Sequence, residues 1–427
     1  MSSSDEASVE RLTDETIERY RNYVNPGLAT VHAFSGFAVP GSHARGCYIW
    51  DASGRKFLDC VGGYGAFSLG HLHPKVVEAV KRQLEREALK SQYLLCAELA
   101  EACELLARVL PGEIRYSFLC GSGTEAVEGA LKAARIHTGR PEFIGAVNGF
   151  HGKTFGSLSV SGRELYKTPF YPLLPETKHV PFGDADALAS AVSERTAAVI
   201  LEVIQGEGGV ILAPDGYFPR VREICDRVGA LLILDEVRTC LGRTGKMFAS
   251  EHYGVVPDIV TMAKALGGGV MPVGAFSSTE AVWQSLFGTN PYLHSSTFGG
   301  NPLACAAVIA AIKTTIEEGL VERSARLGEV LLEGLKAVQS RYPEMIKDVR
   351  GIGLLAGVEF TEDDIAMLVI AGCGKRDLLM AYSLNNPKVI RVEPPLIIEE
   401  SELRRALDIL AESVEETAEL LRGAASQ

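Results

Sequence analysis

The sequence predicts an α/β fold built around a mainly parallel sheet. Between Ala97 and about Gly269, short aliphatic runs alternate with segments whose apolar residues recur at helical spacing. This alternation is typical of strand–helix–strand units. The runs are four or five residues long and end in polar residues or glycine, as strands buried on both faces do. Ligands of such sheets bind in the crevice at the carboxyl ends of the strands, so we expect the functional side chains there.

The elements at the start of the chain are expected to be a helix, two strands and a second helix. The first helix is predicted over residues 13–23, and Asn25-Pro26-Gly27 ends it. Two short strands, 47–50 and 56–60, flank a glycine-containing turn. Proline is favoured at the first helical position, so the second helix is predicted to start near Pro74.

The middle of the chain supplies the sheet, and the end supplies a second, smaller unit. Strands are expected at 116–119, 143–147, 198–203, 231–234, 258–262 and 354–360, and helices at 124–135, 219–228, 301–316 and 320–341. We divide the chain into an N-terminal segment that joins the small domain (1–75), a large domain (76–315) and a C-terminal small domain (316–427).

Composition and charge narrow the class of protein. The chain has 427 residues, of which 47% are hydrophobic, and a formal net charge of −12. The negative charge argues against binding to nucleic acid or an anionic membrane, which need a basic surface. No apolar run approaches the roughly 18 residues of a membrane span, and the acidic, polar N-terminus lacks the features of a targeting peptide. We expect a cytoplasmic protein.

The cysteines and histidines give no metal or disulfide pattern. The nine cysteines are scattered through apolar segments without a CxxC pair, which favours reduced thiols packed as small hydrophobic side chains. A reducing compartment follows. His71 and His73 could suggest a metal pair, but no third ligand accompanies them, so we expect histidines that bond within their own turn.

Two charged side chains follow two of the predicted strands. The strand at 231–234 ends in Asp235, and the strand at 258–262 is followed by Lys264 and then three glycines. A carboxylate and an amine at these strand ends suit pyridoxal phosphate, which condenses with a lysine amine and needs an acidic partner for its pyridine nitrogen. Taken alone, Lys264 could be a surface lysine and Asp235 a helix cap.

A glycine-rich turn is the candidate site for a phosphate group. Gly121, Ser122, Gly123 and Thr124 precede or open the helix at 124–135. Exposed N–H groups at the positive end of a helix bind anions, and the two hydroxyls add donors. A turn of this kind alone is also what an ordinary capped helix start looks like.

The segment DEVRTCLGRTGKMFASEHYGVVPDIVTMAKALGGG resembles the class III (omega) aminotransferases, which have pyridoxal-phosphate fold type I. The resemblance extends over nearly the whole chain. It implies a seven-stranded-type, mainly parallel sheet flanked by helices, a smaller α+β domain, and a homodimer with a shared active site, which could assemble further into a tetramer. It also implies that Lys264 binds the cofactor as a Schiff base and moves the substrate proton, that Asp235 faces the pyridine nitrogen, and that Thr297 reaches the neighbouring subunit's phosphate.

The resemblance places further residues around the cofactor. Phe150 is expected to stack on the ring, with His151 in the same segment, and Val237 to pack on one ring face. Glu202, which ends a predicted strand, and Arg238 are also placed among the cofactor-binding residues.

Glu207 and Arg391 resemble the family's acid–arginine pair, which serves substrate binding. An arginine fork binds a carboxylate through two parallel hydrogen bonds. Arg391 is expected to bind 2-oxoglutarate or glutamate in one half-reaction. In the other, it stays with Glu207 while a substrate without an α-carboxylate binds. This arrangement implies ping-pong transamination.

Two positions depart from the family pattern. Lys153 stands where many members have arginine, and because lysine is a poorer clamp for a carboxylate, it favours a diamine such as putrescine. The phrases YVNPG, FLDCVGGYG and IRVEPPL also resemble putrescine aminotransferases. Arg238 stands where the family usually has glutamine. It could act on the cofactor's phenolic oxygen, turn away, or meet an acceptor of the substrate.

The sequence therefore predicts a transaminase that moves a terminal amino group between an amine and 2-oxoglutarate. An ornithine-, acetylornithine- or GABA-type enzyme, or one that aminates a specialised aldehyde or ketone, is the alternative within the family. The Glu207–Arg391 pair argues against an aminomutase or decarboxylase on the same fold. The argument against a non-catalytic binding protein is that four residues are intact: Lys264, Asp235, Thr124 and Thr297.

Overall fold

A seven-stranded sheet forms the centre of the computed structural model, which describes residues 3–35, 38–91 and 93–425. Its strand order is β4–β12–β11–β10–β7–β5–β6. The neighbours from β11 to β6 pair in parallel, whereas β12 is antiparallel to both β11 and β4. The predicted mainly parallel sheet is confirmed. The strands are β4 (Tyr116–Cys120), β5 (Glu142–Ala146), β6 (Thr177–Val180), β7 (Thr196–Glu202), β10 (Leu231–Asp235), β11 (Ile259–Met262) and β12 (Gly274–Ser278).

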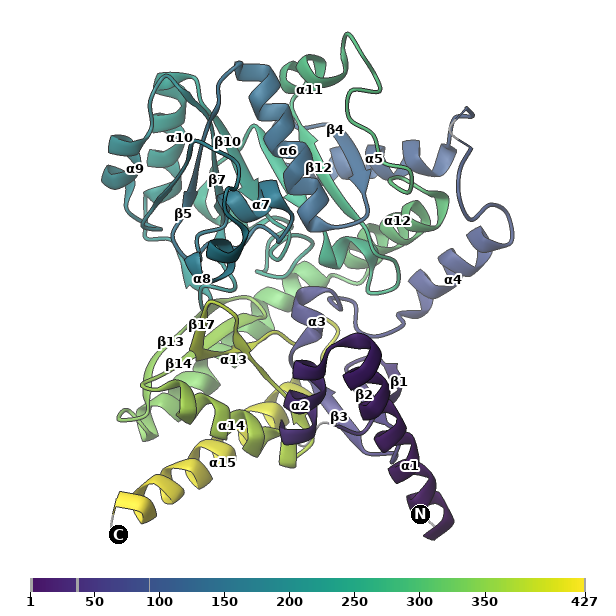
Figure 1. Ribbon diagram of the computed structural model, residues 1–427, viewed down its shortest axis with the longest axis vertical. Coiled ribbons are helices and arrows are strands. Elements are labelled where there is room, and N and C mark those ends of the chain that lie inside the picture. Colours follow the sequence, from purple (N-terminus) through teal and green to yellow (C-terminus); the bar gives the residue numbers. More distant parts are fainter. Residues whose placement is uncertain (1–2, 36–37, 92, 426–427) are drawn as a thin grey trace.

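Alternate residues of β10 pack on opposite faces of this sheet. Ile233 lies in a cluster with residues of α6, whereas Leu232 and Leu234 lie in a cluster with residues of α10. Side chains of a strand alternate between faces, so helices cover both sides, and the whole of β10 is buried. This explains why the strand is a continuous aliphatic run. Figure 1 shows the helices around the sheet.

The helices around the sheet are α4 (Pro74–Leu84), α5 (Ala97–Val109), α6 (Gly123–Thr138), α7 (Phe155–Val160), α8 (Glu164–Lys167), α9 (Ala185–Ala191), α10 (Tyr217–Val228), α11 (Glu280–Phe287) and α12 (Pro302–Glu317), with 3₁₀ turns η2 (Thr168–Phe170), η3 (Ala249–Tyr253) and η4 (Lys264–Gly267). Of these helices, α4 and α5 precede the first strand of the sheet in the chain, and the others lie between or after its strands. A short hairpin, β8 (Ile204–Gln205) and β9 (Ile211–Leu212), follows β7.

Two smaller sheets lie beneath the seven-stranded sheet in Figure 1. One has the order β13–β14–β17–β16, and the other, β1–β2–β3–β15, joins both ends of the chain because β15 pairs with β3. The division at residues 75 and 315 stays a prediction. The elements are α3 (Gly62–Gly65), β1 (Gly41–Arg45), β2 (Tyr48–Asp51), β3 (Lys56–Asp59), α13 (Leu320–Arg341), β13 (Ile346–Ile352), β14 (Leu355–Phe360), α14 (Asp363–Lys375), β15 (Leu378–Leu379), β16 (Ala381–Ser383), β17 (Asn386–Val392) and α15 (Glu400–Ala425).

The first helix begins ten residues earlier than predicted. It is α1 (Ser3–Arg19), followed by a π-helical turn, η1 (Tyr20–Val24). Thr13 resembled a helix start in the sequence, but its hydroxyl donates to the Val9 carbonyl inside the helix. The predicted break is confirmed at Asn25. Its side chain accepts from the next N–H groups and so caps a further helix, α2 (Pro26–Ser35).

The strands β6 and β12 were not predicted. β12 reads GAFSS and contains no β-branched residue, yet all five residues are buried between β4 and β11. Its close packing depends on Gly274, where a Cβ atom would lie 2.2 Å from the Ser122 carbonyl oxygen. A strand specified by its neighbours in this way leaves little signal in its own sequence.

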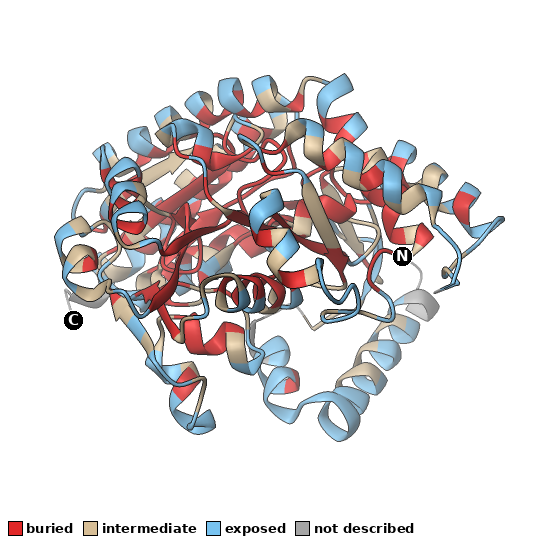
Figure 2. Ribbon diagram, turned by 90° about the horizontal axis from the view of Figure 1, so that it is seen from above, coloured by how far each residue is buried: buried red, intermediate tan, exposed pale blue. Residues whose placement is uncertain are grey.

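Burial decreases outward from the seven-stranded sheet, as Figure 2 shows. All nine cysteines are free and seven are buried. His71 bonds to Asp59 of β3, with 2.8 Å between Nε2 and Oδ2, so the prediction of a bond within its own turn is wrong. Within the part of the chain that the structure describes, no helix is both long and apolar enough to cross a membrane.

Candidate active site

A cavity of about 470 Å³ lies at the carboxyl ends of β10 and β11. Those two strands pair with Asp235 opposite Thr261, so the acid and the lysine leave neighbouring strands at one edge of the sheet. Eleven of the twelve residues predicted to bind the cofactor line the cavity. They are Gly121, Ser122, Gly123, Thr124, Phe150, His151, Glu202, Asp235, Val237, Arg238 and Lys264.

Lys264 begins the turn η4, two residues after β11 ends. Its φ of 47° lies in the left-handed region, which a residue with a side chain seldom adopts and which is frequently found at functional sites. Burial, together with the charge of Arg238, lowers the pKa of its amine to about 8. A lysine with such a pKa exposes a neutral, nucleophilic amine near neutral pH.

Asp235 is fixed by a buried histidine. The Nδ1 atom of His151 lies 2.7 Å from Asp235 Oδ2, and the Val237 N–H donates to Asp235 Oδ1. The His151 backbone in turn donates to the Ser161 hydroxyl. Both side chains are buried, so the carboxylate has one orientation at the cavity wall. We assign His151 to positioning Asp235, which the sequence did not reveal.

The start of α6 offers hydrogen-bond donors for an anion. Ser122 caps the helix, and the Glu125 carboxylate already accepts from the Gly121 N–H at 2.7 Å and from the Ser122 hydroxyl at 3.2 Å. Thr124 Oγ1 lies within 2.8 Å of the hydroxyls of Thr154 and Ser157. The sequence reasoning missed these last two, although the run of hydroxyl residues after Lys153 was visible.

Glu202 joins the loops on either side of the cavity. It ends β7 and accepts from the N–H groups of Phe150, at 2.9 Å, and Gly206, at 3.0 Å. Burial raises its pKa to about 7; the nearby His151 opposes this rise and Asp235 adds to it. Glu202 therefore holds the Phe150 loop and the turn that carries Glu207.

Glu207 and Arg391 are in contact, as the sequence predicted. Arg391 lies on β17, which is an inner strand of its sheet, and its Nη1 atom is 2.6 Å from Glu207 Oε1. Glu207 lies in the turn between β8 and β9, and its other carboxylate oxygen accepts from the Leu384 N–H. The Arg391 guanidinium is 5.1 Å from the centre of the Tyr64 ring. The pair lies behind Arg238, which lines the cavity.

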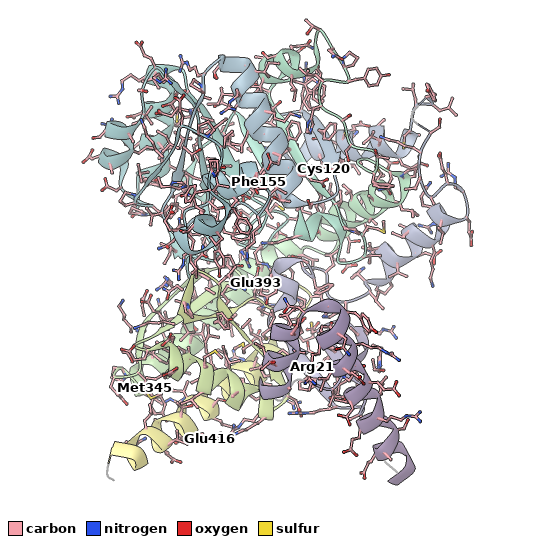
Figure 3. The ribbon with its side chains drawn as sticks, in the orientation of Figure 1. Arg21, Cys120, Phe155, Met345, Glu393 and Glu416 are labelled. Atoms are coloured by element: carbon pink, nitrogen blue, oxygen red, sulfur yellow. The ribbon has the colours of Figure 1, made fainter. Side chains whose placement is uncertain are left out.

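Arg238 binds two carboxylates. Its Nη2 atom is 2.5 Å from Glu207 Oε1, and its Nη1 atom is 2.7 Å from Glu393 Oε2. Figure 3 shows Glu393 at the junction between the C-terminal sheet and the loops of the seven-stranded sheet. The sequence reasoning missed Glu393, although an acid two residues after Arg391 was visible in RVEPPL.

Besides Glu207 and Arg391, two predicted residues do not line the cavity. Lys153 is exposed, and its Nζ atom lies 4.2 Å from the centre of the Tyr166 ring. This geometry gives no support to a substrate contact of Lys153 or to the choice of a diamine on that ground. Thr297 is exposed on the loop between α11 and α12 and is also absent from the cavity wall.

The cavity fits pyridoxal phosphate. Two polar parts of its wall match the two ends of that molecule. The start of α6, where the Gly121 N–H bonds the Glu125 carboxylate, suits the anionic phosphate, and the fixed Asp235 suits the pyridine nitrogen. Phe150 and Val237 supply apolar faces, and Lys264 supplies the amine. Gly152 keeps the cradle open, because a Cβ atom there would lie 2.3 Å from Thr124 Oγ1.

Comparisons with known proteins define the class. The family model "Aminotransferase class-III" matches residues 33–414, so the chain belongs to the class III aminotransferases and uses pyridoxal phosphate. It is 47% identical to the putrescine aminotransferase of Pectobacterium atrosepticum over 414 residues, which covers 93% of this chain and 87% of that relative.

Solved structures agree in fold. The ornithine aminotransferase of Toxoplasma gondii ME49 is 31% identical, with a TM-score of 0.89 over 98% of this chain and all of that one (100%). A transaminase from the marine bacterium Virgibacillus is 28% identical, with a TM-score of 0.85 over 90% of this chain and 94% of that one.

The low pKa of Lys264 predicts how cofactor capture depends on pH. Only the neutral amine is a nucleophile. With a pKa of about 8, the neutral fraction rises about tenfold per unit below pH about 7.5 and levels off above pH about 9. Stopped-flow absorbance of the cofactor-free protein mixed with pyridoxal phosphate should follow this curve. A rate that still rises tenfold per unit at pH about 9.5 would show an ordinary lysine.

Proposed function

We propose that this aminotransferase moves a terminal amino group from a diamine such as putrescine to 2-oxoglutarate, giving an aminoaldehyde and glutamate. The Glu207–Arg391 contact carries the proposal, because a paired arginine that can be released lets one pocket take substrates with and without an α-carboxylate. The similarity to a putrescine aminotransferase supports a diamine as the donor.

The roles of the residues follow from their chemistry. When bound, pyridoxal phosphate supplies the aldehyde that takes the amino group and a ring that withdraws electrons from the reacting carbon. Lys264, as a neutral amine, accepts the proton from that carbon and then donates it to the cofactor side of the transferred amino group. Asp235, held by His151, keeps a positive charge on the pyridine nitrogen.

Arg391 distinguishes the two half-reactions. While it stays paired with Glu207, its charge is neutralised and the pocket accepts an amine. When a 2-oxo acid binds, Arg391 turns to the substrate carboxylate and forms two parallel charge-assisted bonds. The same pocket therefore serves both substrates in a ping-pong sequence.

We also propose a homodimer in which Thr297 completes the partner's phosphate site. Large apolar side chains are exposed on two loops of the single chain: Tyr93, Leu94 and Leu95 on one, and Tyr292 and Phe298, next to Thr297, on the other. Exposed apolar patches of this kind are typical of protein interfaces. Sedimentation should give twice the chain mass of 45.8 kDa; a stable, active monomer would contradict the shared site.

A panel of amino donors tests the substrate. With 2-oxoglutarate as acceptor, putrescine should give a kcat/KM at least about tenfold above those of ornithine, acetylornithine and GABA, because pocket contacts discriminate substrates on this scale. The kcat/KM for cadaverine should lie between that for putrescine and those for the other three donors. Glutamate formation provides the assay. A preference for ornithine or GABA would favour the ornithine- or GABA-type alternative.

A further inference from the structure

Arg238 is held much more firmly than Arg391. Its two terminal nitrogens bind Glu207 at 2.5 Å and Glu393 at 2.7 Å, and Nη1 also donates to the Tyr64 carbonyl at 3.3 Å. Arg391 approaches Glu207 to 2.6 Å. In the part of the chain that the structure describes, Glu207 is the one carboxylate with which Arg391 pairs. Glu207 therefore contacts one arginine that also has a second carboxylate, Arg238, and one that pairs with Glu207 alone, Arg391.

The backbone leaves room for Arg238 and for Glu393. A Cβ atom on Gly206 would lie 2.1 Å from Arg238 Nε, and one on Gly65 would lie 2.6 Å from Glu393 Oε1. A larger residue at either position would force the facing side chain to shift. The two glycines therefore leave space for the Arg238–Glu393 pair.

The pKa shifts of Glu207, Arg238 and Arg391 show the same difference between the two arginines. The pKa of Glu207 is lowered to about 2: burial acts against this, and the charges of Arg238 and then Arg391 outweigh it. The pKa of Arg391 is lowered, first by burial and then by the charge of Arg238. The pKa of Arg238 is raised, because the carboxylates Glu393 and Glu207 more than offset the effect of burial. Arg391 is thus the cation that gains most from a new carboxylate.

We propose that Arg238 is a specificity-determining residue for the substrate with a carboxylate: it keeps Glu207 paired when Arg391 leaves Glu207 to bind that carboxylate. A buried carboxylate that loses its only cation is strongly disfavoured. Because Arg238 stays bound to Glu207, Glu207 keeps a cation when Arg391 leaves. Glu207 need not move, since the Leu384 N–H and Arg238 already hold it. The inference rests on the proposed function, because it concerns the amino acceptor.

The replacement Arg238→Gln tests the role. Glu207 would then bind Arg391 alone, so the carboxylate substrate would have to break a stronger pair. Glutarate is an unreactive dicarboxylate, and its Kd for the holoenzyme can be measured by titration calorimetry. We expect this Kd and the KM for 2-oxoglutarate to rise about tenfold or more, which is the scale of coupling between linked sites. The single-turnover kcat/KM for putrescine should change less than about threefold.

Two further variants guard against a loss of structure. Arg238→Lys keeps a cation near Glu207 and should recover part of the glutarate affinity. Arg220→Gln removes an arginine from an exposed pair with Glu223 on α10 and should leave both half-reactions unchanged. An equal fall in the 2-oxoglutarate and putrescine half-reactions of Arg238→Gln would overturn the proposal, as would an unchanged Kd for glutarate.

A double-mutant cycle separates this role from direct binding. In the Glu207→Gln background Arg391 is no longer held, so adding Arg238→Gln should change the glutarate Kd by less than about twofold. The same loss in both backgrounds would show that Arg238 itself binds the carboxylate and would overturn the proposal. If wild type fails to transaminate putrescine with 2-oxoglutarate, the proposed function is wrong, while the glutarate cycle still decides the role of Arg238.

Discussion

Turnover should fall by at least about ten-thousandfold in Lys264→Ala, which also loses the covalently held cofactor. The replacement removes the nucleophilic amine and the proton-transfer base together, and a positioned base alone contributes about 10²- to 10⁴-fold. The low pKa of Lys264 and its left-handed backbone both mark it as the reactive lysine of the cavity.

The measurement is the rate of glutamate formation, with absorbance and dialysis used to follow the bound cofactor. Lys246→Ala provides a matched control, because Lys246 is an exposed lysine in the same stretch of chain. Its activity should equal that of wild type. A Lys264→Ala enzyme that keeps more than about a hundredth of wild-type turnover would refute the assignment of the base.

The second large effect is expected for Asp235→Asn. Asparagine is close in size to aspartate and can still accept a hydrogen bond from His151, but it carries no charge to hold a proton on the pyridine nitrogen. Loss of a buried electrostatic partner at the reacting group costs about 10²- to 10³-fold in kcat. The fold should persist, so the melting temperature tests for structural damage separately.

Asp226→Asn is the control for this charge. Asp226 is exposed, pairs with Arg222 within α10, and does not line the cavity. Its replacement should leave kcat unchanged. If Asp235→Asn stays within about threefold of wild-type kcat with the cofactor bound, Asp235 does not serve the reaction in the proposed way.

The parts of the fold that could be predicted are those that a short stretch of sequence specifies by itself. β10 and β11 are aliphatic because both faces are covered, so their ends, and with them Asp235 and Lys264, could be located from pattern alone. The candidate phosphate site could be located for the same reason, because Gly121 to Thr124 directly precede or begin α6.

The parts that were missed depend on contacts between distant segments. Arg238 bonds to Glu393, which is 155 positions away in the sequence, and no local pattern predicts such a pair. His151 orients Asp235 across 84 positions. Lys153 differs from these residues: its position in a motif suggested a substrate contact, whereas its side chain lies over the Tyr166 ring and does not line the cavity. A local motif shows that a residue is near a site, but not where its side chain ends.

The central claim is that Lys264, at the end of β11, carries the cofactor opposite Asp235. It is tested most directly by reducing the holoenzyme with borohydride, which makes the lysine–cofactor bond permanent, and by locating the added mass in a peptide digest. We expect one phosphopyridoxyl group per chain, on Lys264. Attachment at another lysine, or no retained mass in an active preparation, would contradict it.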